Sequence, residues 1–128
     1  MSGSPTILLS TDLIEARQSV FAPEEGAEVR FLGVVRADEA GKTLRGIDYT
    51  AYHSMASRTL ADLIDEGQRE HGAHRVFIQH RLGFVPVGDA SIAIYVLTKH
   101  SGAAFDLCRW YLQRIKQTVP IWKNPVTV

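Results

Sequence analysis

Residues 102–116 read GAAFDLCRWYLQRIK and are the most informative stretch of this 128-residue sequence. Its apolar side chains recur at spacings of three and four, which is typical of a helix that buries one face; they are Ala104, Leu107, Cys108, Tyr111, Leu112 and Ile115. Ser101 precedes the stretch and is expected to cap it, and Pro120 should end it. The pattern predicts an amphipathic helix.

Strand-like segments accompany this helix. Residues 90–98 are nearly all apolar, as expected of a central strand that is covered on both faces. Residues 55–69 carry apolar side chains at helical spacing and predict a second main helix that ends near Gly72. We also expect strands at residues 6–9, 27–36, 45–53 and 76–82, a short helix at 12–19, and a loop or turn at 37–43 and 83–89.

The helices are too few for a parallel, doubly wound sheet, because such a sheet needs a crossover helix between most neighbouring strands. We therefore expect an α+β fold with a mostly antiparallel sheet and two main helices. The length suits one domain, so residues 1–128 should form a single domain, with residues 1–5 as a loose terminus.

Composition excludes several classes of protein. Hydrophobic residues make up 45% and charged residues 22%, as in an ordinary globular domain. The apolar runs are far shorter than the ~20 residues that cross a bilayer, and no secretory signal pattern begins the sequence, so we expect a cytoplasmic protein without a membrane contact. Cys108 is the only cysteine, which excludes an internal disulfide; on the apolar stripe it is expected to be a core residue.

Charge is unevenly distributed although the net charge is zero. Residues 1–70 contain 7 Lys/Arg and 12 Asp/Glu, whereas residues 71–128 contain 7 and 2, so the two parts carry −5 and +5. The basic part favours an anionic ligand or an acidic partner. The alternative is that the two parts neutralise each other within the fold.

Two lysines lie near the end of the last predicted helix. Lys116 ends the helix, and Lys123 follows seven residues later. Pro120 and Trp122 between them should form a stiff apolar turn that partly desolvates Lys123, and desolvation makes an amine a better base or nucleophile. The alternative for Lys116 is a purely electrostatic role at the helix C-terminus.

Other candidate residues are placed to bind anions. Arg36 closes a predicted strand, where its guanidinium could bind a carboxylate or phosphate or could instead pair with Asp38 or Glu39. His100 and Ser101 precede a helix N-terminus, whose free amides favour an anion; the alternative is that Ser101 only caps the helix and His100 is exposed.

Weaker candidates complete the survey. His71 and His74 would form a metal pair only if further ligands converged on them. His80 is expected on the polar side of an alternating strand. The sequence contains none of the glycine-rich phosphate-binding motifs, which disfavours a nucleotide-dependent enzyme.

A series of short motifs follows one another from about Ala27 to Lys123. They are Phe31-Leu-Gly-Val-Val-Arg36, Tyr52-His-Ser-Met55, His80-Arg-Leu-Gly83 with Val87-Gly-Asp89, Lys99-His100 and Lys116-Gln-Thr-Val-Pro-Ile-Trp-Lys123. This succession resembles the MoaE family, the catalytic (large) subunits of molybdopterin synthase. The Lys-x-x-x-Pro-Ile-Trp-Lys ending is its most specific part.

The resemblance implies an α/β hammerhead fold and a homodimer within a heterotetramer. A small ubiquitin-like sulfur-carrier subunit would dock at each end and insert a Gly-Gly C-terminus that carries a thiocarboxylate. Its sulfur would pass to cyclic pyranopterin monophosphate, and two rounds would build the dithiolene of molybdopterin. The resemblance implies no metal and no redox cofactor in this subunit, and no nucleic-acid partner.

Carried over by position, Lys116 and Lys123 match the catalytic lysines of the family. The resemblance places substrate-binding positions at Arg36, His100, Ser101, Pro120 and Trp122. Arg36 and His100 could belong to the pocket of their own copy or reach the pocket of the other copy in the dimer.

The chain departs from the family pattern at Ser101, where arginine is usual, at Thr50, where an acidic residue is common, and in the short tail after Lys123. A non-catalytic relative that only binds a small ubiquitin-like partner is therefore an alternative. An acylphosphatase-like enzyme would need an asparagine such as Asn124 to orient water. A nucleic-acid-binding module would need clustered basic and aromatic residues.

Overall fold

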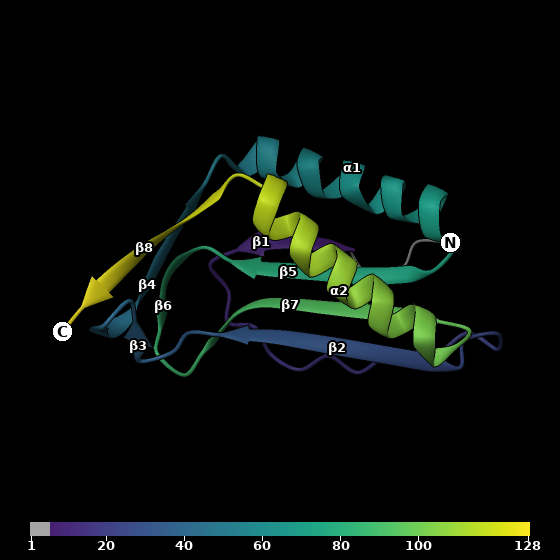
Figure 1. Ribbon diagram of the computed structural model, residues 1–128, viewed down its shortest axis with the longest axis horizontal. Helices are drawn as coiled ribbons and strands as arrows, with labels where there is room; N and C mark the ends of the chain where they lie inside the picture. Colours follow the sequence, from purple (N-terminus) through teal and green to yellow (C-terminus); the bar gives the residue numbers. More distant parts are fainter. Residues whose placement is uncertain (1–5) are drawn as a thin grey trace.

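The computed structural model describes residues 6–128, so the loose terminus expected at residues 1–5 lies outside the described residues. Along the chain the elements are β1 (Ile7–Ser10), β2 (Ala27–Val34), β3 (Asp38–Glu39), β4 (Lys42–Ala51), α1 (His53–His71), β5 (Arg75–Arg81), β6 (Gly83–Pro86), β7 (Ala90–Thr98), α2 (Ser101–Thr118) and β8 (Ile121–Thr127) (Figure 1). Two main helices and mostly antiparallel strands confirm the α+β prediction.

The main sheet has the strand order β1-β5-β7-β2. Only the β1–β5 pair is parallel among these described strands; β5–β7 and β7–β2 are antiparallel. Helices α1 and α2 cover one face of this sheet (Figure 1). Every residue of β7 after Ala90 is buried, which confirms the predicted central strand.

A second, smaller sheet lies beyond one end of α2 (Figure 1). Strand β4 pairs with β6 along one edge and with β8 along the other, and β3 forms a short hairpin with β4. This sheet has its own apolar cluster of Val35, Leu44, Ile47, Tyr49 and Val85. The two sheets meet where α2 ends, and that junction positions the site described below.

Both predicted main helices are present and pack against each other. The apolar stripe of α2 enters the main core, and Cys108 is buried there as expected. Tyr111 is fully buried, and its hydroxyl lies 2.6 Å from Nε2 of His74. Gly67 of α1 faces that hydroxyl so closely that a Cβ at this position would overlap it. The approach of α1 to α2 therefore requires glycine at position 67.

The short helix expected at residues 12–19 is wrong. Residues 11–26 form neither helix nor strand and cross the sheet face opposite the helices, where Ile14 packs on a cluster that contains Phe77 and Tyr95. The Arg17 amide donates to the Tyr95 hydroxyl at 3.3 Å, and Arg30 donates to the Arg17 carbonyl at 2.5 Å. Side chains of the sheet thus satisfy backbone groups that a short, marginal helix would have paired internally.

Other boundaries differ because strand pairing overrides local turn signals. Part of the expected turn at residues 83–89 is strand β6, and part of the expected loop at 37–43 is the β3–β4 hairpin. The turn expected of Pro120 and Trp122 is wrong, because Ile121–Thr127 form strand β8 and pair with β4. His53 begins α1 instead of ending β4, and His100 occupies the N-cap of α2 without a side-chain bond, so the capping role expected of Ser101 is wrong.

Among residues 6–128, no helix is both long enough and apolar enough to span a membrane.

Replacing Gly67 tests the helix contact. We expect Gly67→Ala to lower the free energy of unfolding by about 1–3 kcal/mol, because the new methyl group displaces the Tyr111 ring from a packed core. Urea denaturation followed by circular dichroism measures the change. Gly102→Ala is the matched control: it also adds a methyl group to a helix, but its Cβ meets nothing within 4 Å. An equal loss of unfolding free energy in the two variants would contradict the requirement for glycine at position 67.

Candidate functional site

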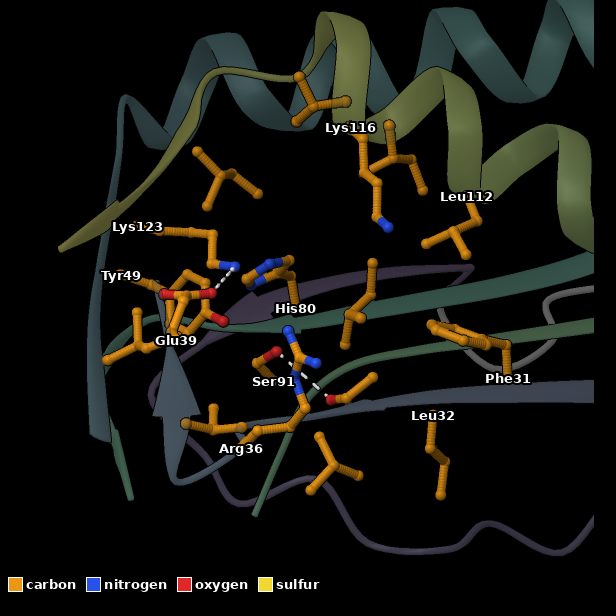
Figure 2. Close-up of a pocket in the computed structure, with 18 residues that line it drawn as sticks. Phe31, Leu32, Arg36, Glu39, Tyr49, His80, Ser91, Leu112, Lys116 and Lys123 are labelled. Atoms are coloured by element: carbon orange, nitrogen blue, oxygen red, sulfur yellow. Dashed lines mark hydrogen bonds and ion pairs between the residues drawn. The ribbon is translucent and has the colours of Figure 1, made fainter. Parts of the chain in front are cut away.

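A cavity of about 670 Å³ opens at the junction of the two sheets (Figure 2). Its walls come from the end of β2 and the residues after it, from β3, β4, β5 and β7, from the last turns of α2, and from the start of β8. Residues far apart in the sequence therefore meet only after both sheets have formed.

Two lysines from adjacent elements reach this cavity. Lys116 lies in the last turn of α2, and Lys123 lies on β8 opposite Tyr49 of β4. Because side chains alternate along a strand, Ile121 and Lys123 face the cavity while Trp122 faces away. The Lys123 ammonium lies 3.1 Å from a carboxylate oxygen of Glu39, and this ion pair is partly exposed to solvent.

Arg36 supplies a third cation to the cavity. A register shift between Gly33 and Val34 changes the direction of the chain at the end of β2. The next residue, Val35, is then held by two backbone hydrogen bonds: its amide donates to the Asp89 carbonyl at 3.0 Å, and its carbonyl accepts from the Gly88 amide at 2.9 Å.

The alternative ion pair of Arg36 with Asp38 or Glu39 does not form among the described residues, and Glu39 pairs with Lys123 instead. Figure 2 shows the Arg36 guanidinium within the cavity. Arg36 can therefore offer its donors to an anionic ligand.

The structure does not bring every candidate residue into this cavity. His100 and Ser101 are exposed at the opposite end of α2, which is about 22 Å from Lys116 at 1.5 Å per residue. Pro120 lies between α2 and β8 but does not line the cavity, and neither does Trp122.

The expected desolvation of Lys123 by Trp122 is wrong. The Trp122 ring packs edge-on against Tyr52, with 5.4 Å between ring centroids, on the side away from the cavity. The Lys123 side chain remains 54% exposed.

Two polar residues of the cavity, Glu39 and His80, were considered from the sequence in other roles: Glu39 as an ion-pair partner of Arg36, and His80 on the polar side of a strand. Tyr49 and Ser91, which also line the cavity, were not singled out as site residues. His80 is buried, and its position on the polar side of β5 was wrongly expected: it shares a face with Val76 and Ile78 of the main core. The strict alternation of β5 was a signal that could have revealed this placement. The pairing of Glu39 with Lys123 depends on the β3–β4 hairpin and had no such signal.

The histidine pair considered for metal binding has another structural role. His74 Nδ1 donates to the Gly72 carbonyl at 2.7 Å, and Nε2 accepts from the Tyr111 hydroxyl. Burial lowers the pKa of His74, and burial raises the pKa of Tyr111, so both groups stay neutral in this contact. No group of three or more potential metal ligands occurs among residues 6–128.

Taken together, the fold and the site define a small α+β protein whose two sheets enclose a cavity lined by three cations from β8, α2 and the end of β2. Residues 9–118 match the family model described as "MoaE protein". The chain therefore belongs to the MoaE family, which confirms the resemblance seen in its motifs.

Relatives with this fold have been named and solved. The chain is 38% identical over 104 residues to a molybdopterin synthase catalytic subunit of Thermoplasma volcanium, covering 81% of this chain and 76% of that one. A crystal structure of molybdopterin synthase from Staphylococcus aureus is similar with a TM-score of 0.91 and 28% identity, covering 98% of this chain and 94% of that one.

A third neighbour shows the fold alone. A complex of subunits 1 and 2 of molybdopterin-converting factor from Helicobacter pylori has a TM-score of 0.64 at 21% identity, covering 82% of this chain and 73% of that one. Several curated relatives are longer than this chain, which spans between 52% and 76% of the length of four of them.

Proposed function

We propose that this chain is the catalytic subunit of a molybdopterin synthase. In this proposal it transfers sulfur from the C-terminal thiocarboxylate of a small ubiquitin-like subunit to cyclic pyranopterin monophosphate. The observation that carries the proposal is the convergence of Arg36, Lys116 and Lys123 in one open cavity of a MoaE-family fold. Both reactants are anions, and a cavity lined by three cations attracts and orients anions.

The two lysines have separate roles in this proposal. Lys123 positions the sulfur acceptor, and Lys116 stabilises the charge that develops on the acyl group as sulfur departs. The sulfur forms a new bond to a carbon of the pterin while a carbon–oxygen bond at that carbon breaks, and the departing oxygen keeps the electron pair and takes up a proton. Water then hydrolyses the resulting thioester between sulfur and the acyl carbon. The tail leaves as an ordinary carboxylate whose second oxygen comes from that water. Arg36 holds the phosphate of the pterin.

The partner in this proposal is a small sulfur-carrier subunit with a Gly-Gly C-terminus. The Helicobacter pylori neighbour is a complex of two subunits of molybdopterin-converting factor, which supports a two-subunit assembly here. We further propose that the protein acts in the cytoplasm, that residues 1–128 form one domain, and that the heterotetramer contains two copies of this chain.

A homodimer would account for the distance between His100 and the cavity. Strand β2 is an edge of the main sheet, and Leu32 and Val34 on it are half exposed, as is Phe105 on α2. Covering such an edge with a second copy is a common solution in proteins. If the two copies were related by a two-fold axis beside β2 and perpendicular to α2, their α2 helices would be antiparallel. His100 and Ser101 of one copy would then lie towards Lys116 of the other.

The other candidate functions have less support. The non-catalytic alternative is favoured by Ser101, but the retention of Lys116 and Lys123, both in the cavity, argues against it. The acylphosphatase alternative needs Asn124 near the cations, but the Asn124 amide donates to the Asp48 carbonyl at 3.1 Å and does not line the cavity. The synthase reaction is therefore the better proposal.

Reconstitution tests the proposed reaction. The chain is mixed with thiocarboxylated small subunit and cyclic pyranopterin monophosphate, and the product is detected as its fluorescent oxidised derivative. We expect Lys116→Ala and Lys123→Ala each to lower turnover by about 10²–10³-fold, the usual effect of removing a group that stabilises developing charge. Arg58→Ala on the exposed surface of α1 is the control and should leave turnover unchanged.

Normal turnover in both lysine variants would refute the assigned roles. A wild-type chain that binds the small subunit stably but yields no product would instead support the non-catalytic alternative.

Mixing two inactive variants tests the shared site. If Lys116 of one copy works with His100 of the other, a dimer of one His100→Ala chain and one Lys116→Ala chain has one intact site and one doubly altered site. Random reassociation should then restore about one quarter of wild-type turnover, because half of the dimers are mixed and each has one working site. Turnover no higher than that of the separate variants would show that the site is confined to one copy.

A further inference from the structure

The cavity contains a buried imidazole to which the reaction above assigns no role. Val76, Ile78 and His80 point to the same face of β5, and the first two enter the main core. At the position of His80 the core has ended and the cavity begins, so the side chain lines the cavity floor while only 8% of it is exposed. Figure 2 shows the imidazole between the ends of Lys123, Lys116 and Arg36.

The contacts of His80 determine which of its nitrogens carries the hydrogen. Nδ1 lies 2.9 Å from the Arg81 carbonyl, and a carbonyl can only accept, so Nδ1 carries the hydrogen and donates it. The Tyr49 ring packs edge-on at 4.9 Å between centroids and holds the plane of the imidazole. In the neutral ring Nε2 then has a free lone pair, and among residues 6–128 the only hydrogen bond of the ring is the one at Nδ1. Nε2 is not among the fully buried atoms without a partner, so it is open to the cavity.

The surroundings keep this imidazole neutral. Burial lowers the pKa of His80 and outweighs the hydrogen bond to the Arg81 carbonyl, which acts in the opposite direction. The Glu39 carboxylate is the one acidic group on the cavity wall within the described residues, and it is engaged by Lys123. Nε2 of His80 therefore remains an acceptor at physiological pH.

This acceptor complements the rest of the cavity. Lysine and arginine side chains only donate hydrogen bonds, so Arg36, Lys116 and Lys123 can recognise anionic groups but not N–H or O–H groups. Nε2 is open to the cavity, so a ligand that fills the cavity must supply a donor to this nitrogen or leave it unpaired away from water, which costs free energy. The three cations and Nε2 of His80 therefore favour a ligand that carries an anionic group for the cations and an N–H or O–H group for this nitrogen.

We propose that Nε2 of His80 accepts a hydrogen bond from an N–H or O–H group of the bound substrate. This inference rests on the proposed function, and it adds a specificity-determining residue to that site. The substrate class is an anion that also presents a hydrogen-bond donor, which fits a phosphate-bearing pterin with its ring N–H groups.

Two isosteric variants separate the two nitrogens of His80. In His80→Asn the side-chain amide can still donate to the Arg81 carbonyl, but it is too short to present an acceptor at the position of Nε2. In His80→Gln the side-chain oxygen reaches that position, although the donor to Arg81 is lost. We expect KM for cyclic pyranopterin monophosphate to rise about tenfold in the Asn variant with a smaller change in kcat, and to stay within about threefold of wild type in the Gln variant.

Equal KM values in wild type and His80→Asn, or an equal loss in both variants, would overturn the inference, because a merely structural histidine would not distinguish them. Nitrogen NMR of the wild-type chain keeps the test independent of folding in the variants. Adding cyclic pyranopterin monophosphate should shift the His80 Nε2 resonance towards that of a hydrogen-bonded nitrogen, and an unchanged resonance at saturation would overturn the inference.

The failure of the proposed function would be distinguishable. Absence of product from the wild-type chain in reconstitution would reject the proposed function, and the NMR titration would still decide whether His80 contacts the pterin. Product formation together with an unshifted Nε2 resonance would reject only the role of His80.

Discussion

The pairing of β8 with β4 is the contact through which this chain acquires its site. Pro120 cannot continue α2, and Val119 before it is extended, so the chain leaves the helix directly into a strand. That strand aligns along β4, and Lys123 arrives opposite Tyr49. Without this pairing Lys116 would remain an ordinary lysine at a helix end, and neither sheet alone would enclose the cavity.

The helices and central strand could be predicted from the sequence because their signals are local. The apolar spacing of α1 and α2 and the apolar run of β7 each reflect burial within one element. Strand β8 could not be found in this way, since residues 121–127 are mostly exposed and form a strand only because β4 offers an edge. For the same reason, neither β6 nor the irregular path of residues 11–26 could be predicted, because their contacts are with residues elsewhere in the chain.

The candidate site was predictable to a similar extent. Lys116, Lys123 and Arg36 followed from the motifs, and the structure brings all three together. His100 and Ser101 followed from the same resemblance, but the fold of one chain separates them from the cavity. His80 opens one of the quoted motifs and Glu39 belongs to none, but neither was placed in the site, because their positions depend on strand phase and on a hairpin. Roles that depend on a second copy or a partner chain cannot be read from one sequence.

The charge asymmetry of the sequence also has a structural explanation. Acidic residues of the first part pair with basic residues of the second in Glu25–Arg75, Glu66–Arg114 and Glu39–Lys123, so the two parts partly neutralise each other. The guanidinium of Arg75 lowers the pKa of the Glu25 carboxyl in one of these pairs. In the cavity neutralisation is incomplete, because three cations there face a single carboxylate.

The proposed mechanism requires the C-terminus of a small subunit to reach Lys116 and Lys123. The chain contains two further lysines outside the cavity, Lys42 and Lys99, which serve as internal controls. Carbodiimide coupling of the complex would join the terminal carboxylate of the small subunit to the nearest amine, and peptide mass spectrometry would identify the linked lysine. A link to Lys116 or Lys123 is the predicted result, whereas a link confined to Lys42 or Lys99 would contradict the proposed site.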